Sequence, residues 1–305
     1  MNLLSRSFDH AKHAHMRVLR YFVVAVLAGT AALALPAPAH AAPSWTSPLI
    51  APGVSHTFTW NNANPLNIAY EVGLNPQLAT PEAPCEFEIM RVWYVQQYQG
   101  LERQLKVTIK NIGAIFCYTV VWLREMPTIA PANWYTPVLK PGEISTHTWN
   151  NAGLTSSHIP GLVPMGATSS APCQLEVISR WDVLHYDEAG GVEREFKFKV
   201  ANVGAISCMG AILLGSSSIN LPWIANMMAP GEVGTFARNN ANPLDKVYAI
   251  GIKPSHTQSG FSCEFGVQRR WYLQRINLDG TPEREFWFTV KNVGNLLCGP
   301  NILLT

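Results

Sequence analysis

The amino-acid sequence predicts an all-β protein that consists of three tandem β-sandwich repeats, each braced by one disulfide bond. A segment that begins with tryptophan and ends with Pro-Gly starts at Trp45, Trp134 and Trp223, 89 residues apart each time. The six cysteines fall two to a repeat. Stretches with apolar residues at every second position, typical of half-buried strands, recur in each copy. A unit of about 89 residues is a domain and not one turn of a solenoid.

Residues 1–41 have the pattern of a secretory signal peptide. Arg17 precedes an apolar run over residues 21–35, and Ala-His-Ala supplies the small residues of a cleavage site directly before Ala42. Met16 is an equally good start of such a peptide. A permanent membrane anchor is the alternative, but a run of about 15 residues is short for a hydrocarbon core of about 30 Å. We therefore expect a secreted protein with no membrane insertion after cleavage.

The expected mature chain carries almost no net charge. The full chain has 22 Lys and Arg residues against 20 Asp and Glu residues. The first 41 residues hold four of the basic residues and one of the acidic residues, which leaves 18 against 19. Binding to the phosphates of nucleic acid or to anionic lipid needs clustered positive charge. The composition therefore argues against nucleic acid and membrane surfaces as partners.

The repeats divide the mature chain into domains at residues 42–131, 132–220 and 221–305. A domain of this size has a marginal hydrophobic core, and export favours disulfides as the brace. Pairing within each repeat treats every copy identically, whereas the regular alternative between repeats, Cys117 with Cys173 and Cys208 with Cys263, leaves two cysteines over. The predicted bridges are Cys85–Cys117, Cys173–Cys208 and Cys263–Cys298.

The first predicted strands of each repeat are short and precede its first cysteine. In the first copy they cover residues 57–60 and 68–72, and a longer alternating strand follows Cys85. Phe87 and Trp93 would share one face of that strand, because side chains two apart lie on the same side. The tryptophan eight residues after the cysteine is therefore expected to face the core near the disulfide. Its equivalents in the other copies are Trp181 and Trp271.

The clearest strands lie near the end of each repeat and open a hairpin. They begin with Glu-Arg and end with Asn-Ile-Gly or Asn-Val-Gly, over residues 102–113, 193–204 and 283–294. Asn and Gly tolerate the positive φ of a tight turn, and an apolar closing strand follows the second cysteine. The mature sequence contains no convincing amphipathic helical pattern. Each repeat is therefore predicted to be a small sandwich of about six or seven strands.

The Lys-Asn-Val-Gly type of turn between the two late strands resembles that of bacterial extracellular Ig-like modules of the CARDB type. The resemblance covers about twenty residues of each repeat. It implies an Ig-like sandwich with a role in adhesion or spacing outside the cell, and no catalysis.

One polar motif recurs directly after an early strand of each repeat, as Trp-Asn-Asn-Ala twice and Arg-Asn-Asn-Ala once. A planar group beside two amides suits a shallow sugar site, since the plane stacks on the apolar ring face and the amides bind hydroxyls. The alternative is an Asn-Asn turn with left-handed φ that needs no ligand. The candidate binding residues are Trp60, Asn61, Asn62, Trp149, Asn150, Asn151, Arg238, Asn239 and Asn240.

Two sets of charged residues also lie near these strands. The Glu-Arg pair recurs unchanged at residues 102–103, 193–194 and 283–284. Adjacent residues on a strand point to opposite faces, so we expect a cross-strand salt bridge or a polar cap and not a shared site. The arginines beside the strand tryptophans vary in spacing, which favours solvated or edge-strand positions. They are Arg91, Arg180 and Arg269.

No catalytic or metal-binding motif recurs in the three copies. The chain lacks Gly-x-Ser-x-Gly, HExxH, phosphate-loop and DxDxDG patterns, and no CxxC or matched histidine pair suits zinc. A site in a single copy, around Asp182, His185 and Asp187, is the alternative. We expect no enzyme activity, no cofactor and no metal.

The sequence thus predicts a secreted, non-catalytic binding or adhesion protein with three equivalent weak sites. A cell-surface glycan or an extracellular protein is the expected partner, and tandem weak sites gain avidity when a ligand engages several at once. The alternative is a structural component of an extracellular assembly. It rests on 10 tryptophans and only 14% charged residues, which leave apolar surface between repeats for a partner.

Overall fold

The computed structural model describes most of the chain beyond residue 43. By its internal contacts the chain divides into two units, Met1–His40 and Ala41–Thr305, and every described residue belongs to the second. The signal-peptide prediction for residues 1–41 lies outside the described residues. These are 44–61, 63, 66–98, 102–129, 134–150, 152–186, 190–218, 222–242, 244–255 and 261–305.

The described residues form 17 strands and no helix, which confirms the all-β prediction. Residues 42–131, called segment 1 below, contain β1 (Ser44–Thr46), β2 (Ser55–Trp60), β3 (Ile68–Gln77), β4 (Cys85–Gln96), β5 (Arg103–Asn111) and β6 (Tyr118–Pro127). Segment 2, residues 132–220, contains β7 (Ile144–Trp149), β8 (Ser156–Met165), β9 (Cys173–Tyr186), β10 (Val192–Asn202) and β11 (Met209–Ser218). Segment 3, residues 221–305, contains β12 (Pro222–Ile224), β13 (Val233–Arg238), β14 (Ile250–Ser255), β15 (Cys263–Ile276), β16 (Pro282–Asn292) and β17 (Gly299–Leu304).

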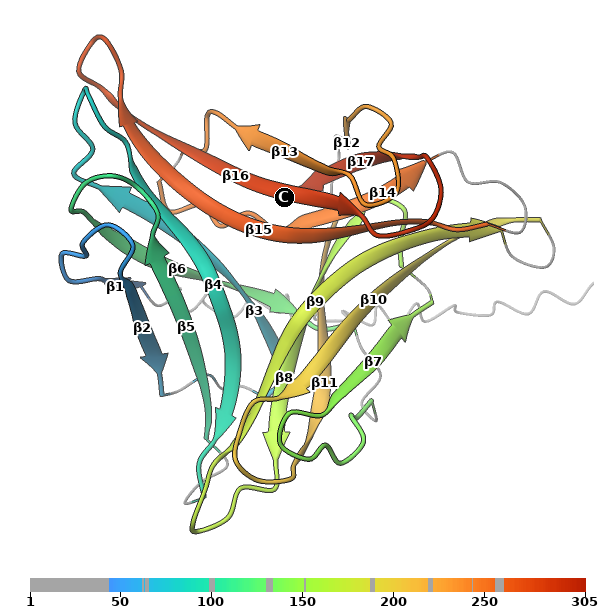
Figure 1. The fold of residues 1–305 in the computed structure, drawn as a ribbon. Helices are drawn as coiled ribbons and strands as arrows, with labels where there is room; N and C mark the ends of the chain where they lie inside the picture. Colours follow the sequence, from blue (N-terminus) through green and yellow to red (C-terminus); the bar gives the residue numbers. More distant parts are fainter. Residues whose placement is uncertain are drawn as a thin grey trace, which may run out of the picture. The chain divides into compact units, whose positions relative to one another are not determined.

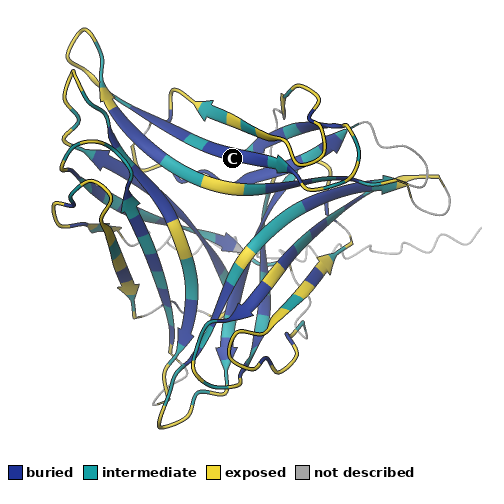
Figure 2. Cartoon of the chain, viewed as in Figure 1, coloured by how far each residue is buried: buried dark blue, intermediate teal, exposed yellow. Residues whose placement is uncertain are grey.

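The strands of each segment lie in two antiparallel layers. In segment 1, β2, β5 and β4 form one layer, and β1, β6 and β3 form the other. The first layer recurs as β7–β10–β9 and β13–β16–β15, and the second as β11–β8 and β12–β17–β14. Buried residues concentrate between the layers (Figure 2). The structure is thus open and sandwich-like, as expected for all-β segments of this length.

The late strands follow the alternation that the sequence predicts. In β5, Leu105, Val107 and Ile109 are buried, and the residues between them are only half-buried. In β16, Phe286, Phe288 and Val290 lie in the core in the same way. A half-buried strand of period two therefore places one row of side chains between the layers.

The three disulfides connect the two layers of each segment. Cys85 begins β4 and Cys117 directly precedes β6, with 6.0 Å between their Cα atoms. The Cα–Cα distances of Cys173–Cys208 and Cys263–Cys298 are 5.8 Å and 6.2 Å, and these bridges occupy the equivalent places. The predicted pairing is confirmed, and all six cysteines are buried.

The three longest strands, β4, β9 and β15, pair with one another at their ends (Figure 1). The last part of β4 pairs with the first part of β9, the last part of β9 with the first part of β15, and the last part of β15 with the first part of β4. We call these the β4–β9, β9–β15 and β15–β4 seams, and the region that they surround the junction. The same head-to-tail contact, used three times, closes on itself and joins nine strands into one sheet.

Three equivalent glycines allow the inner strands of neighbouring segments to approach closely. A Cβ atom on Gly251 of β14 would lie 2.8 Å from the Cα atom of Ser157 on β8. A Cβ atom on Gly161 would lie 3.0 Å from the Cα atom of Ala69, and one on Gly73 would lie 3.2 Å from that of Val247. At Gly73 the Cγ2 atom of Val247 would be closer still, at 2.7 Å. The glycines are needed here because a backbone atom of the neighbouring segment would come within 3.2 Å of the Cβ atom in each case.

The prediction that the strand tryptophans face the core is wrong. The register of β4 shifts between Ile89 and Arg91, so that Met90 forms a β-bulge, and β9 and β15 shift at the equivalent positions. A bulge reverses the side of the strand on which the following residues lie. Tyr94 therefore enters the core and Trp93 is only half-buried on the opposite face.

Candidate functional site

The Trp-Asn-Asn-Ala motifs lie at three separate edges of the nine-stranded sheet. Trp60 ends β2, Trp149 ends β7 and Arg238 ends β13. The Trp60 indole packs against Trp45 and Tyr70, with ring centroids 6.2 Å and 4.9 Å away. Trp149 packs against Trp134 at 6.0 Å. Both indoles thus belong to aromatic clusters at the margin of the core, and the three motifs are not brought together.

The asparagines of these motifs are exposed where the structure describes them. Asn61, Asn150, Asn239 and Asn240 are exposed, as is Arg238, whereas Asn62 and Asn151 lie outside the described residues. The Asn61 carboxamide oxygen accepts a hydrogen bond of 3.0 Å from Gln104.

Each motif is held by a buried arginine, which the sequence analysis did not foresee. Arg103 is 1% exposed and donates to the carbonyls of Ala63 at 2.8 Å and Ile68 at 2.7 Å. Arg284 donates to the carbonyls of Ala241 and Lys246, both at 2.9 Å. Arg194 in segment 2 contacts the same loop. Of the expected cross-strand salt bridge or polar cap, Arg194 forms a cross-strand salt bridge with Asp182, whereas Arg103 and Arg284 bind backbone carbonyls. The invariance of these arginines in three copies was the signal of a buried function.

The same buried groups also link neighbouring segments. Arg103 donates to the carbonyl of Leu162 on β8 at 3.2 Å, and Arg284 donates to the carbonyl of Leu74 on β3 at 2.7 Å. In segment 2 the carboxylate of Asp182 replaces the guanidinium in this role and accepts from the Ile252 amide at 2.9 Å. A buried charge with several backbone partners fixes the relative position of the strands it joins.

The surroundings of the buried arginine differ in segment 2. In segments 1 and 3 the guanidinium lies over Tyr94 and Tyr272, and burial raises the pKa of both phenols to about 12. In segment 2, Asp182 stands at that position and pairs with Arg194 at 2.7 Å, while burial raises the pKa of the carboxyl. His158 lies beside them, and burial together with Arg194 lowers its pKa to about 3. The histidine is therefore neutral near pH 7.

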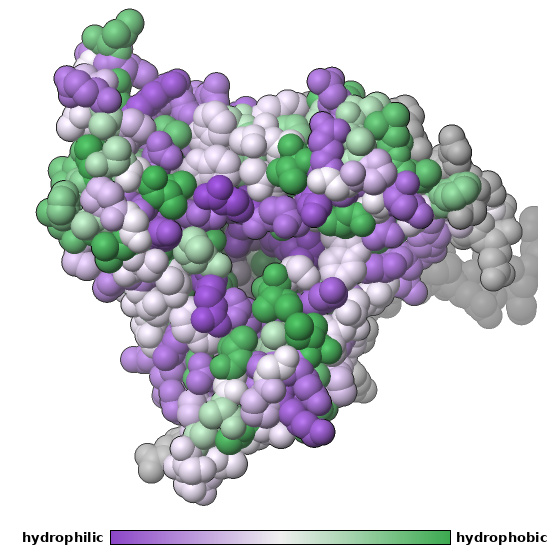
Figure 3. Space-filling view, in the orientation of Figure 1, coloured by the Kyte–Doolittle hydropathy of each residue, from purple (hydrophilic) through white to green (hydrophobic). Residues whose placement is uncertain are grey.

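A cavity of about 210 Å³ lies at the junction, among residues of all three segments. Figure 3 shows it as a hollow at the centre of this face, bordered by hydrophilic and hydrophobic residues. We call it the junction cavity. Because it lies where β4, β9 and β15 meet, only the folded ring of segments creates it. The residues used below are Glu71, Met90, Arg91, Glu176, Ile178, Ser179, Arg180, Gln268 and Arg270.

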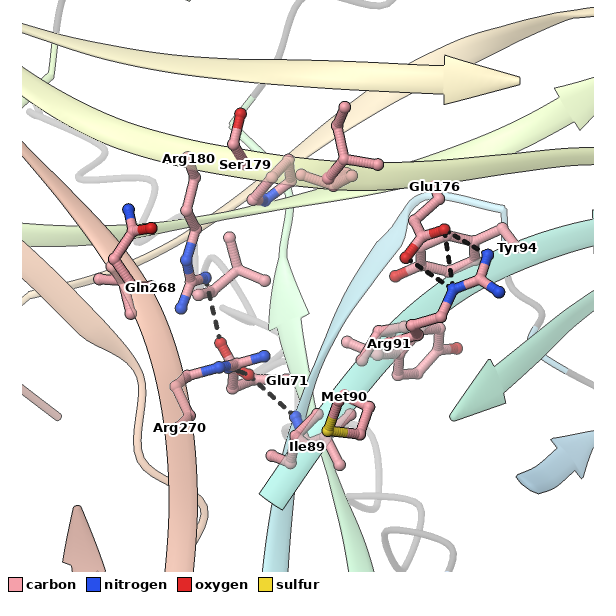
Figure 4. Close-up of a pocket in the computed structure, with 18 residues that line it drawn as sticks. Glu71, Ile89, Met90, Arg91, Tyr94, Glu176, Ser179, Arg180, Gln268 and Arg270 are labelled. Carbon is pink, nitrogen blue, oxygen red and sulfur yellow. Dashed lines mark hydrogen bonds and ion pairs between the residues drawn. The ribbon is translucent and has the colours of Figure 1, made fainter. Parts of the chain in front are cut away.

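The inner wall of the junction cavity carries a buried ion triad (Figure 4). Glu71 of β3 lies between Arg180 of β9 and Arg270 of β15, and its carboxylate accepts from both guanidinium groups. Burial alone would raise the pKa of Glu71, but attraction from Arg270 and Arg180 outweighs it and holds this pKa below its ordinary value. The triad therefore joins one strand from each segment through charge.

The mouth of the junction cavity is formed by the bulge residues. Met90 and Ile178 are 45% and 43% exposed, and Gln268 is the exposed bulge residue of β15. Arg91 lies beside Met90 and pairs with Glu176 across the β4–β9 seam, at 3.1 Å from the guanidinium Nε atom to the carboxylate. A ligand would therefore meet aliphatic side chains at the mouth and charged groups below them.

The strand tryptophans lie near this mouth on the outer face, each beside a cation. The Arg91 guanidinium is 4.9 Å from the Trp93 ring centroid, and that of Arg269 is 5.5 Å from Trp271. Such cation–π contacts are worth about 0.5–1 kcal/mol when exposed. These aromatic rings are half-buried and are not among the residues that line the cavity.

Sequence reasoning missed the junction cavity because its residues come from three distant parts of the chain. The expectation that Arg180 is solvated or at an edge is wrong, since its side chain is only 13% exposed and pairs with Glu71. The sequence did show that Arg180 lies one residue before its tryptophan, whereas Arg91 and Arg269 lie two residues before theirs. This irregular spacing marked the second copy as different from the others near the cavity.

Two further findings concern other classes of site. Within the described ranges no cluster of three or more His, Cys, Asp or Glu side chains is arranged to hold a metal ion. Among the same residues no helix is long and apolar enough to span a membrane. Asp182 and His185 lie in β9, with Asp182 engaged by Arg194, and Asp187 is outside the described residues. Comparison with protein family models, curated proteins and solved structures found no match to this chain.

Proposed function

We propose that the chain is an exported, non-catalytic binding protein whose principal ligand site is the junction cavity. The observation that supports this most directly is the convergence of one strand from each segment on a single hollow with charged inner residues and an aliphatic mouth. A concave site with a few polar groups in an otherwise rigid sheet is typical of small-ligand binding. Three disulfides suit an oxidising, extracellular compartment.

The state of the charged groups favours binding over chemistry. Glu71 is paired with two arginines, and Glu176 with Arg91. Groups held in ion pairs position a ligand well, whereas a general acid or base needs a pKa near the working pH. A volume of about 210 Å³ fits a small molecule or one terminal unit of a glycan or protein.

A test of the site uses the oxidised mature chain and ligand-observed NMR with glucose, glucuronate, butyrate and butyramide. Saturable binding by at least one probe is expected. Ile178→Trp places an indole at the mouth and is expected to abolish it. Ile144→Trp is the matched control, since Ile144 is 54% exposed on the edge strand β7. Equal binding by both variants, or no binding of any probe, would contradict the proposed site.

An adhesion function through the three Asn-Asn turns is the second candidate. Asn61, Asn150 and Asn239 are exposed at equivalent strand ends. The backbone N–H of the alanine after each turn donates a hydrogen bond to the backbone carbonyl of the buried arginine of the same segment. A glycan array with the mature chain and the triple variant Asn61→Ala/Asn150→Ala/Asn239→Ala tests it. Binding that persists in the triple variant would exclude these turns as the glycan site.

The alternative role as an assembly component has its own supporting feature. Leu49, Val138 and Met227 occupy equivalent positions in the three segments and are 58%, 65% and 42% exposed. Repeated exposed apolar residues suit contact with another protein. Replacing all three by serine would then lower recovery of a co-purifying extracellular protein, while the Ile178→Trp variant would retain it.

A further inference from the structure

One of the three seams lacks an ion pair that the other two share. Arg91 pairs with Glu176 across the β4–β9 seam, and Arg269 pairs with Glu88 across the β15–β4 seam. At the β9–β15 seam the equivalent positions hold Ser179 and Gly266. Both members of the pair are replaced together, so no single charge is left without its partner. The departure from the pattern is therefore confined to one side of the junction cavity.

The same seam gains polar groups that the others do not have. The bulge residue is Gln268 in β15, where β4 has Met90 and β9 has Ile178. A Cβ atom on Gly266 would lie 3.4 Å from the Gln268 side-chain nitrogen and 3.3 Å from the Arg180 carbonyl oxygen. The absence of a side chain at Gly266 thus leaves the Gln268 amide beside β9, and Figure 4 shows it near Arg180 at the cavity.

Next to this seam the cavity carries one more positive than negative charge. The position that is Val92 in β4 is Arg180 in β9 and Arg270 in β15, and Glu71 is the carboxylate that both contact. The Nη2 atom of Arg180 is buried and has no hydrogen-bond partner among the described residues. This donor has almost no accessible surface, so a ligand in the cavity would meet the other guanidinium atoms of Arg180 and Arg270, whose side chains are 13% and 17% exposed. An anionic oxygen forms charge-assisted hydrogen bonds with such groups.

The triad also has a purely structural role, because it joins β3 to β9 and β15. Structure alone does not account for the second arginine, since one guanidinium would neutralise Glu71. It also does not account for Ser179 and Gly266, which remove bulk and charge at the same seam, or for Gln268, which adds an amide there. Excess positive charge beside a seam that lacks the ion pair of the other two indicates a site for an anion.

We infer that the junction cavity binds a monocarboxylate group at the β9–β15 seam, on the cavity side of Arg180 and Arg270 and not in the place between them that Glu71 occupies. This inference rests on the proposed function of the cavity as a ligand site. The Gln268 amide and the Ser179 hydroxyl are further donors within the lining. Met90 and Ile178 at the mouth contact the aliphatic part of the ligand. A carboxylate matches the single excess charge, whereas a phosphate group carries about two negative charges near Glu71.

The test compares butyrate with its neutral isostere butyramide by calorimetric titration of the oxidised mature chain, with inorganic phosphate as a third probe. Butyrate is expected to bind saturably, with butyramide and phosphate each at least about tenfold weaker. Equal affinity for butyrate and butyramide would overturn the carboxylate inference and leave the cavity as a ligand site. Tighter binding of phosphate would also overturn it. If none of the probes binds, glucose and butyramide included, the proposed function of the cavity as a ligand site would be contradicted as well.

Variants separate recognition from folding. Gln268→Met installs the residue type of the first segment and is expected to weaken butyrate about threefold to tenfold with little effect on the thermal midpoint. Arg180→Val installs the residue type of Val92 and is expected to abolish butyrate binding. Lys140→Gln is the control, since it also removes one positive charge and that side chain is 77% exposed and does not line the cavity.

If Arg180→Val fails to fold, Ser179→Arg combined with Gly266→Glu provides a second test. It installs at the β9–β15 seam the pair that closes the other seams. We expect a folded protein with butyrate affinity at least about tenfold lower. Unchanged affinity in this folded variant or in Gln268→Met would place the anion elsewhere and contradict the inference.

Discussion

Arg269 of β15 donates to both carboxylate oxygens of Glu88 on β4, with both distances 2.7 Å. The two residues are 181 positions apart in the chain, and their pair lies on the seam that closes the ring of segments. A two-pronged guanidinium–carboxylate contact fixes the register of the strands as well as their proximity. Arg91 and Glu176 repeat the same relationship at another seam.

The Arg269–Glu88 ion pair is expected to contribute only a small coupling energy to the stability of the protein. Arg269 is 52% exposed, so water and salt screen its attraction to Glu88. A double-mutant cycle with Glu88→Gln and Arg269→Gln should give a coupling energy of about 0.5–1 kcal/mol at low salt. Urea unfolding of the four proteins measures it. A coupling above about 2 kcal/mol would show that the pair is less screened than its exposure indicates.

The stability of the protein should be sensitive to a single methyl group at the three equivalent glycines, Gly73, Gly161 and Gly251. Gly251→Ala places Cβ 2.8 Å from the Ser157 Cα atom, so strands β14 and β8 must separate. We expect a loss of about 1–3 kcal/mol in the free energy of unfolding. Gly234→Ala is the control, because its Cβ would meet the Phe236 ring at 3.1 Å and not backbone. Denaturant midpoints that fall equally in both variants would contradict this explanation.

Removal of a buried arginine should destabilise the fold strongly. Arg103→Met leaves the carbonyls of Ala63 and Ile68 without the guanidinium that they accept from. We expect a loss of about 3 kcal/mol or more, since each unsatisfied buried group costs about 1–3 kcal/mol. Lys140→Gln, at a side chain 77% exposed, should change the stability by less than about 0.5 kcal/mol. Thermal unfolding compares the two, and an effect of Arg103→Met as small as the control's would refute the role.

His158 should make the protein less stable in mild acid. Its pKa is about 3 in the folded state and about 6.5 when unfolded, so the unfolded chain binds the extra proton as the pH falls below about 6.5. About 2 kcal/mol should be lost between pH 6.5 and pH 5. Asp182, with a raised pKa, acts in the opposite direction but is present in both proteins compared.

The matched variant is His158→Tyr, because the equivalent residues Tyr70 and Tyr248 are tyrosines. The difference in unfolding free energy between wild type and variant should change with pH only below about 6.5. A difference that stays constant from pH 7.5 to pH 5 would mean that His158 takes up a proton in the folded state.

Each disulfide should contribute about 4 kcal/mol to stability. The sequence separation of Cys263 and Cys298 is 35 residues, and closing such a loop restricts the unfolded chain by about this amount. Cys263→Ala with Cys298→Ala should lower the free energy of unfolding accordingly. Urea titration of the oxidised proteins measures it. A loss below about 1 kcal/mol would indicate that the unfolded chain is already compact in this region.

Local sequence patterns identified the strands well but misplaced residues beyond a bulge. The alternation of Leu105, Val107 and Ile109 placed the inner face of β5 correctly, because a regular strand keeps a period of two. The same reasoning failed for Trp93, since Met90 adds one residue to β4 and exchanges the two faces. A bulge depends on the pairing of two strands, and a single strand sequence does not encode its position clearly.

The candidate site could be predicted only in part. The Asn-Asn turns were visible because their residues are consecutive. Glu71, Arg180 and Arg270 were not, because they are joined only when three segments close into a ring. The carbonyl partners of Arg103 were not foreseen in place of the expected salt bridge or polar cap, since a sequence shows its charge but not the carbonyls that surround it.

The sequence by itself determined the all-β class, the recurring strands and the three disulfide pairs, because these depend on local periodicity and on cysteines that fall two to a repeat. Only the tertiary structure decided how β4, β9 and β15 pair, which arginines are buried and where the junction cavity lies. The physical reason is that charge burial and cavity formation arise from contacts between residues about 90 to 200 positions apart, as between Glu71 and its two arginines. Local periodicity carries no information about such contacts.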